Sequence, residues 1–260
     1  MQFQTLAYTE KDGILHVKFN RPEKRNVINE LAFTELQQCF AEVATKDSVE
    51  VVLLSGVGKG FSAGTDLTSF HTGDSQQEVR RMVRRYSRAF TEIELVEKAV
   101  IALIHGFCFG AALEIALACD LRICTPEVMF TLPEVNVGVV PDGGSSQRLP
   151  RVIGLGRAKE MILMAKMIDA QKAYDWGLVN EVVKPEELEN TGIKWAKEII
   201  NNSVMGVGLS KRNIDMSMNM SFWDAMECTG LAQSLAFTDP SFVKRMEKRF
   251  LEMTKGKKSE

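Results

Sequence analysis

The chain has 260 residues, 45% apolar and 25% charged, with a formal net charge of −2. This composition is typical of a soluble globular protein with a sizeable core, and the charge argues against nucleic acid as a main partner. No apolar run reaches the roughly 18–20 residues of a membrane span.

The cysteines and histidines are scattered along the chain. The five cysteines form no Cys-x-x-Cys pair, and His16, His71 and His105 lie far apart. The sequence therefore predicts neither a disulfide framework nor a zinc site. The beginning, MQFQTLAYTEKDGILHV, has no apolar or arginine-rich targeting run. We expect a reduced, cytoplasmic protein without a metal or redox cofactor.

Taken in chain order, short β-rich runs alternate with helical stretches. Strands are predicted at residues 14–20, 49–54, 100–104, 121–124, 129–132 and 178–183. Helices are predicted at residues 30–44, 80–94, 111–118 and 172–176, and over 145–165 with interruptions near Pro150 and residues 154–156. Beyond residue 186 the pattern predicts helices only. Such alternation indicates an α/β architecture followed by a helical appendage.

The glycine-rich loop at residues 56–60, GVGKG, does not fit a nucleotide site. The dinucleotide fingerprint needs G-x-G-x-x-G at the opening of a helix, and here the third glycine comes one residue early. A phosphate-binding loop needs Ser or Thr after Gly-Lys, whereas Lys59 is followed by Gly60. We interpret this segment as a tight loop leaving a parallel strand.

A second glycine-rich segment, HGFCFGAALE at residues 105–114, joins a predicted strand to a predicted helix. Gly110, Ala111 and Ala112 are small, so another molecule can approach their backbone closely. The free N–H groups of a first helical turn favour negative charge, as one half of an oxyanion hole requires. Glu114 follows in this otherwise apolar helix and is a candidate acid–base group. The alternative is a surface glutamate at a helix start.

Two further acids lie in LPEVNVGVVPDGG, residues 132–144. Glu134 stands between apolar residues and beside a proline, surroundings that would raise its pKa by desolvation. Its alternative is a solvated loop acid. Asp142 follows eight positions later and precedes Gly143-Gly144-Ser145-Ser146. It is either a third catalytic carboxylate or the cap of the next helix, and the cap is the reading we favour slightly.

Together these segments resemble the crotonase (enoyl-CoA hydratase/isomerase) family. The resemblance rests on FSAGTDL (61–67), HGFCFGAALEIALACD (105–120) and LPEVNVGVVPDGGSSQRLPRVIG (132–154), supported by NRPEKRN (20–26), AQKAYDWGLVNEVV (170–183) and the EKR at 247–249. It covers nearly the whole chain. It implies a spiral of ββα units over residues 1–195, a C-terminal helical region over 196–260 used for trimerisation, and a CoA thioester as substrate. The assembly would be a trimer or a dimer of trimers.

The resemblance also implies roles for particular residues. The oxyanion hole would be the backbone N–H groups of Thr65 and Ala111, and the catalytic acids would be Glu114 and Glu134. Alanine is common where Thr65 stands, and three glycines are common at 110–112; because the backbone supplies the donors, both departures are tolerable. Glycine stands at 142 in the simplest hydratases. The residues expected to contact the acyl-CoA are Lys24, Ala63, Gly64, Asp66, Leu67, Gly110 and Lys248. Lys248 would reach the CoA phosphate from a neighbouring subunit; the alternative is a solvated lysine.

Three functions follow from this pattern. The first is a 2-enoyl-CoA hydratase, with Glu114 activating water and Glu134 delivering a proton. The second is an enoyl- or dienoyl-CoA isomerase, in which Glu134 and Asp142 shuttle a proton. The third is a non-catalytic or RNA-binding relative, against which both glutamates speak. The arginines of the predicted helix at 80–94 are interpreted as a solvated face, with an anionic partner or the CoA phosphates as the alternative: Arg80, Arg81, Arg84, Arg85 and Arg88.

Overall fold

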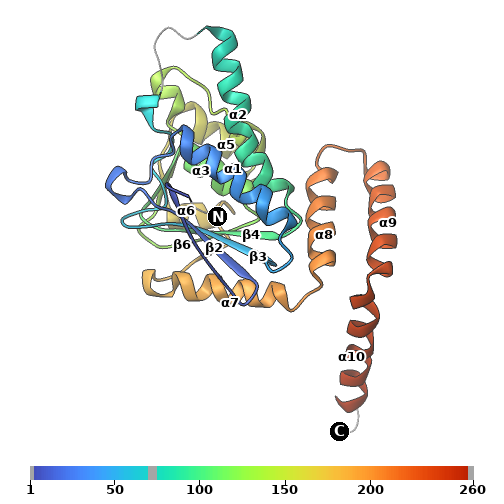
Figure 1. The fold of residues 1–260 in the computed structure, drawn as a ribbon. Helices are drawn as coiled ribbons and strands as arrows, with labels where there is room; N and C mark the ends of the chain where they lie inside the picture. The colour runs from blue at the N-terminus through green and yellow to red at the C-terminus, as the bar shows by residue number, and fades with distance from the viewer. Residues whose placement is uncertain (1–2, 70–74, 257–260) are drawn as a thin grey trace.

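The computed structural model describes residues 3–69 and 75–256, so His71 lies outside the described residues. A six-stranded sheet forms the centre of the fold (Figure 1). Strand β1 (Leu6–Lys11) pairs antiparallel with β2 (Ile14–Phe19). The others follow β2 in parallel: β3 (Val51–Gly56), β4 (Ala99–Ile104), β6 (Leu121–Cys124) and β9 (Glu181–Val182).

A smaller sheet combines β5 (Phe107–Phe109), β7 (Met129–Thr131) and β8 (Ile168–Asp169). The chain visits the two sheets in a repeated order, each time ending in a helix. Strands β4 and β5 lead to α3 (Ala111–Ala118), and β6 and β7 lead to α4 (Ser145–Ile153). Strand β3 leads through an isolated bridge between Ser62 and Cys108 to α2 (Gln76–Leu95). This repetition confirms the predicted α/β architecture of ββα units.

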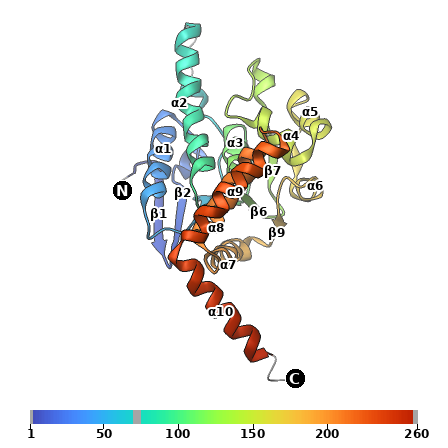
Figure 2. The ribbon, with the colours of Figure 1, turned by 90° about the vertical axis from the view of Figure 1, so that its right-hand side faces the viewer.

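Helices cover both faces of the large sheet (Figures 1 and 2). Helices α1 (Glu30–Thr45), α2 and α3 lie on one face, and α7 (Leu188–Ile200) lies on the other. Successive residues of a strand point to opposite faces, so both faces must be apolar, which explains the continuous apolar runs in the sequence. The first core takes Val52, Leu54, Val100, Ala102 and Ile104, and the second takes Val51, Leu53, Ala99, Ile101 and Leu103.

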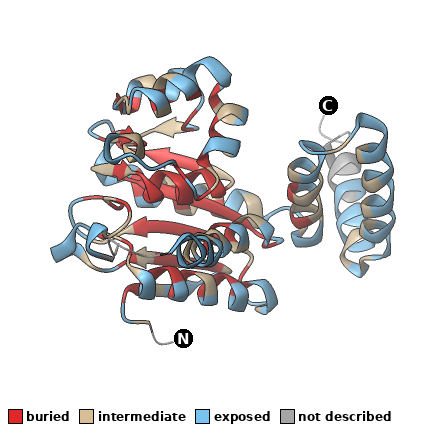
Figure 3. Ribbon diagram, turned by 90° about the horizontal axis from the view of Figure 1, so that it is seen from above, coloured by how far each residue is buried: buried red, intermediate tan, exposed pale blue. Residues whose placement is uncertain are grey.

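The C-terminal helices extend away from this core (Figure 1): α8 (Val204–Ser217), α9 (Phe222–Thr238) and α10 (Pro240–Gly256). In Figure 3 they are mostly exposed, whereas buried residues concentrate in the sheets and α3. Helix α8 is anchored by Lys211, whose ammonium donates to the carbonyl oxygens of Ile93 and Lys98, each at 3.1 Å. Over residues 187–256, the part of this region that the structure describes, the prediction of helices alone is confirmed. The division at residues 195 and 196 stays a prediction.

The remaining elements are short: α5 (Leu155–Leu163), α6 (Ala170–Asp175), and the 3-10 helices η1 (Pro22–Lys24), η2 (Leu67–Ser69), η3 (Glu134–Val137) and η4 (Pro185–Glu187). Two interruptions were predicted in residues 145–165. The one near Pro150 is wrong, because that proline lies inside α4. The one at 154–156 is confirmed, because Gly154, with a φ of 83°, separates α4 from α5. The strand predicted at 178–183 is shorter in the structure, where β9 covers only Glu181–Val182. Strands β1, β5 and β8 were not predicted. Within the described residues, no helix is long and apolar enough to cross a bilayer.

Candidate active site

Three loops that are distant in sequence lie side by side at the ends of the central strands. The amide of Ile28 donates to the carbonyl of Gly64 at 2.8 Å, and the amide of Asp66 donates back to Ile28 at 3.0 Å. Ser62 makes the same kind of parallel exchange with the backbone of Phe107 and Phe109, at 3.3 Å each. The loop at 61–67 is therefore held between the loop at 20–28 and the start of α3.

This arrangement places the loop that carries Thr65 against the start of α3, where Ala111 stands. Gly64 has a φ of 92°, and a Cβ added there would lie 2.6 Å from the carbonyl oxygen of Phe109 and 3.5 Å from the nitrogen of Ala111. Neither the N–H of Thr65 nor that of Ala111 donates a hydrogen bond to any acceptor in the described part of the chain. Two free backbone donors, one of them at the start of a buried helix, suit a developing oxyanion. Their role in catalysis stays a prediction.

Asn26 holds the loops together, and sequence reasoning missed it. Its side chain is almost fully buried, with the amide donating to the carbonyls of Val57 at 2.8 Å and Gly60 at 2.9 Å. Its side-chain oxygen accepts from the amide of Arg21, and its carbonyl accepts from the hydroxyl of Ser62. Its φ of 54° is a conformation that asparagine tolerates better than most residues. An asparagine ending a Pro-containing loop was the available signal.

Glu114 is only 2% exposed, within a helix whose every residue is buried. Its Oε1 accepts hydrogen bonds at 2.8 Å from the amide of Gly143 and from the hydroxyl of Ser145. Burial raises the pKa of Glu114 to about 7, opposed by these two hydrogen bonds and assisted by the negative charges of Asp142 and Glu134. The reading of Glu114 as a surface glutamate is therefore wrong. Sequence reasoning missed Gly143 and Ser145 as its partners.

Glu134 begins η3 and is half-buried. Its Oε2 is buried and accepts no hydrogen bond in the described structure. Gly110, with a φ of 53°, leaves room for it, since a Cβ there would lie 2.9 Å from Oε1. Burial raises the pKa of Glu134, and the charge of Asp142 raises it further. A freely solvated loop acid does not describe this side chain.

Asp142 does not cap a helix. The capping position of α4 is held by Gly144 in a left-handed conformation, without a side-chain capping bond, so the cap prediction is wrong. Asp142 is an exposed residue, yet the surrounding chain displaces part of its hydration and raises its pKa. Because its charge also raises the pKa of both glutamates, the three carboxylates are close enough to influence one another.

The other predicted contact residues surround the same loops, with one exception. Ala63 donates its amide to the carbonyl of Arg25 at 3.0 Å, Lys24 is exposed, and Leu67 is 67% exposed. Asp66 accepts from the backbone and hydroxyl of Thr68 and forms an ion pair with Arg21 at 3.5 Å. Lys248 is exposed on α10, which leads away from these loops (Figures 1 and 2), so one chain alone does not bring it to them.

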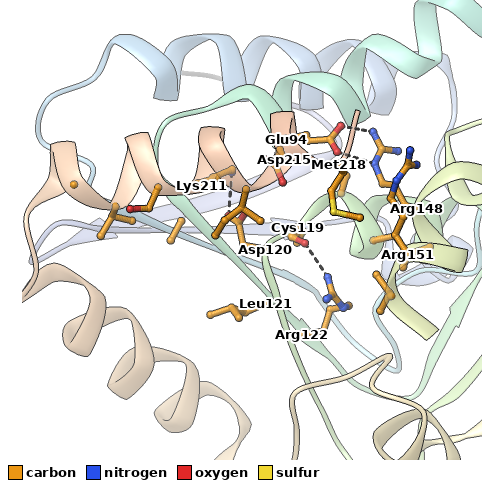
Figure 4. A pocket seen from close by; sticks show the side chains of 18 of the residues that line it. Glu94, Cys119, Asp120, Leu121, Arg122, Arg148, Arg151, Lys211, Asp215 and Met218 are labelled. Carbon is orange, nitrogen blue, oxygen red and sulfur yellow. Dashed lines mark hydrogen bonds and ion pairs between the residues drawn. The ribbon is translucent and has the colours of Figure 1, made fainter. Parts of the chain in front are cut away.

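Two other features lie apart from the carboxylates. The five arginines of α2 are exposed, as predicted for a solvated face, and Arg85 pairs with Glu30 at 2.5 Å. A cavity of about 840 Å³ opens between α8 and the core, with Lys211, Asp215 and Arg148 in its lining (Figure 4). None of the three carboxylates lines it. Within the ranges described, no group of three or more His, Cys, Asp or Glu is arranged to hold a metal ion.

Known proteins resemble this chain in sequence along most of its length. The family model described as "Enoyl-CoA hydratase/isomerase" matches residues 9–255. A short-chain-enoyl-CoA hydratase of Clostridium acetobutylicum is 38% identical over 80% of each chain. A mitochondrial Delta(3,5)-Delta(2,4)-dienoyl-CoA isomerase of Rattus norvegicus is 36% identical over 82% of this chain and 69% of its own.

Solved structures extend the agreement to three dimensions. The crystal structure of an enoyl-CoA hydratase from Bacillus anthracis superimposes with a TM-score of 0.91 at 29% identity, over 96% of this chain and 97% of its own. The spiral of ββα units predicted from the sequence motifs is thus a shared fold. Because the family model matches the chain over residues 9–255, the chain belongs to the enoyl-CoA hydratase/isomerase family of enzymes.

Proposed function

We propose that the protein is an enoyl-CoA hydratase, which adds water reversibly across the 2,3 double bond of a 2-enoyl-CoA thioester. The observation that carries the proposal is Glu114, a buried carboxyl with a pKa raised to about 7 and fixed by Gly143 and Ser145. A base with a pKa near the working pH is suited to proton transfer. The hydratase names of the relatives from Clostridium and Bacillus support the same reaction.

In the proposed mechanism the thioester carbonyl accepts hydrogen bonds from the amides of Thr65 and Ala111. Each donor would stabilise the developing enolate by about 3–4 kcal/mol. Glu114 takes a proton from water as its oxygen adds to C3, and Glu134 gives a proton to C2. The proton left on Glu114 returns to Glu134 through solvent before the next turnover. Glu114 must start ionised in this step, and the hydrogen bonds from Gly143 and Ser145 stabilise that charged form against the burial that opposes it.

The substrate is held by the loops around these groups. We assign contacts with the acyl-CoA to Lys24, Ala63, Gly64, Asp66, Leu67 and Gly110, with Lys248 supplied by a neighbouring subunit. The assembly would be a trimer or a dimer of trimers. No cofactor beyond the CoA of the substrate enters this mechanism. The cytoplasmic location, and the absence of nucleic-acid and membrane partners, remain predictions from the sequence.

A dienoyl- or enoyl-CoA isomerase is the second candidate, favoured by Asp142. This side chain makes no capping bond, and its charge raises the pKa of Glu134. Two coupled acids eight residues apart suit the removal of a proton at one carbon and its return farther along. The isomerase relative of Rattus norvegicus supports this reading.

The test is a panel of 2-enoyl-CoA and dienoyl-CoA substrates, followed by loss of the conjugated thioester absorbance. We expect hydration by the wild type, and we expect Glu114→Gln and Glu134→Gln each to lower kcat by at least about 100-fold. Binding of CoA thioesters should persist in both variants. Near-normal turnover in both would overturn the mechanism, and absence of hydration with active isomerisation would establish the second candidate.

A further inference from the structure

Arg148, on α4, connects a partly buried ion pair to the loop that holds Glu114. Its guanidinium forms a fork with Glu94, Nη2 donating to Oε2 at 2.6 Å and Nε to Oε1 at 3.2 Å (Figure 4). Its remaining nitrogen, Nη1, donates to the carbonyl oxygen of Gly143 at 2.8 Å. The amide of Gly143 donates in turn to Glu114 at 2.8 Å. One glycine is thus held at its carbonyl by Arg148 and at its amide by Glu114.

The packing leaves this turn little freedom. A Cβ at Gly143 would overlap Oε2 of Glu114 and Cε2 of Phe90, and one at Gly144 would overlap the Arg148 guanidinium. The Arg148 side chain is 16% exposed and that of Glu94 is 34% exposed. A planar guanidinium that bonds a carboxylate through two nitrogens has a fixed orientation, unlike a lysine ammonium. The third nitrogen of Arg148 therefore meets the Gly143 carbonyl in a defined direction.

We propose that Arg148, braced by Glu94, is a positioning residue for Glu114 that acts through Gly143. The inference rests on the proposed role of Glu114 as the base. Without the fork, the Gly143 carbonyl would lose its donor, and water could reach it from the cavity that Arg148 and Glu94 line. The Gly143 amide would then drift from Glu114, which would lose both its orientation and a bond that stabilises its charged form.

The same helix offers a matched control. Arg151 lines the same cavity, but its guanidinium donates to the carbonyl of Gln147 at 2.7 Å and to the side chain of Asn219 at 3.0 Å. None of these contacts leads to Glu114. Replacement of Arg151 by methionine therefore removes a similar charge and a similar volume without touching the proposed connection.

The experiment compares Arg148→Met, Arg148→Lys and Arg151→Met in the full chain, by steady-state hydration between pH 5 and 9. We expect both Arg148 variants to lose about 10- to 100-fold in kcat, with KM for the enoyl-CoA within about twofold of wild type. The acid limb of the kcat profile should move to higher pH, because the carboxylate loses a donor. Lysine keeps the charge but cannot form the fork, so it should not rescue. Arg151→Met should behave as wild type.

Two outcomes would overturn the proposal. The first is wild-type kcat and an unchanged pH profile in Arg148→Lys, because positive charge alone would then suffice. The second is an Arg148→Met variant that has lower thermal stability but whose kcat profile keeps its acid limb at the wild-type pH. If Arg148→Met fails to fold, Glu94→Gln takes its place, since the glutamine keeps one of the two acceptors. We expect this variant to move the acid limb of the kcat profile to higher pH as well. An acid limb that stays at the wild-type pH in Glu94→Gln would also overturn the proposal. Infrared titration of isotopically labelled Glu114 in the unliganded protein provides an activity-independent check. If the wild type hydrates nothing, the proposed function fails, while this titration still decides the role of Arg148.

Discussion

At the scale of single residues, the carboxyl of Glu114 is held in an environment that opposes its charge. Desolvation outweighs the hydrogen bonds from Ser145 and Gly143, so the pKa stands at about 7 rather than 4.5. A group that prefers to be protonated in the folded state reduces stability whenever the pH forces it to ionise. The same burial that supports the proposed role of Glu114 in proton transfer therefore makes the folded protein less stable.

The expected consequence is a pH-dependent stability difference between the wild type and Glu114→Gln. Between pH 4.5 and 7 the unfolded carboxyl is ionised while the folded one keeps its proton, so this group's contribution to stability falls as pH rises. The glutamine variant lacks that loss. We expect it to be more stable than the wild type by about 1–3 kcal/mol at pH 8, with the difference fading toward pH 4.5. Urea unfolding at both pH values measures this, and an advantage that grows as the pH falls would contradict it.

In the proposed function, Asp142 is the residue that distinguishes hydration from isomerisation. Because Asp142 caps no helix, Asp142→Asn changes charge without removing a structural bond. We expect the variant to keep most hydration and to lose any isomerisation. Its acid limb should move to lower pH, since the charge of Asp142 raises the pKa of Glu114. A collapse of hydration in a folded Asp142→Asn protein, seen in pH–rate profiles, would reject the hydratase assignment.

At the scale of elements, the site depends on backbone contacts between loops at the strand ends. The bridge between Ser62 and Cys108 and the exchange between Ile28 and the 64–66 backbone bring Thr65 beside the start of α3. These contacts use main-chain atoms, so close approach matters more than side-chain identity. Gly64 is the critical point, because it combines a positive φ with contact against Phe109.

Gly64→Ala should therefore damage both stability and catalysis. The strained φ and the 2.6 Å approach to the Phe109 carbonyl predict a loss of about 1–3 kcal/mol in the free energy of unfolding. A displaced Thr65 amide predicts a lower kcat as well. Gly156→Ala in α5 is the control, since its Cβ would meet nothing within 4 Å, and it should change stability by no more than about 1 kcal/mol. Equal behaviour of the two variants in denaturant unfolding would refute this account of the loop.

At the scale of the whole molecule, the C-terminal helices carry apolar surface that one chain leaves uncovered. Helix α9 buries none of its residues. Among its apolar side chains, Phe222 is 70% exposed, Trp223 is 75% exposed and Leu231 is 69% exposed. Monomers rarely leave apolar patches of this kind in water. Closed symmetric assembly is the usual solution for identical chains.

We expect light scattering at micromolar concentration to show a trimer or a hexamer. Trp223→Asp places a charge within the exposed apolar part of α9, so it should shift the distribution toward smaller species while leaving the sheet core folded. Circular dichroism controls for folding of the variant. A monomeric wild type at that concentration would contradict the prediction and remove the neighbouring subunit as a source of Lys248.

The sequence alone determined the elements whose signal is local. Apolar runs and helical spacing predicted β2, β3, β4, β6, α1 and α3 close to their observed bounds, because periodicity and burial repeat within a few residues. The contiguous motifs identified the family, and they named Glu114 and Glu134 as candidates.

Only the tertiary structure decided which groups meet. Strand β5 has three residues, too few for a pattern, and exists because β7 pairs with it. Gly143 bonds Glu114 across 29 positions and Asn26 bonds Gly60 across 34, distances over which a residue carries no sign of its partner. The cap predicted for Asp142 failed in part for the same reason: Gly144 takes the capping position, in a turn whose Gly143 amide bonds the distant Glu114.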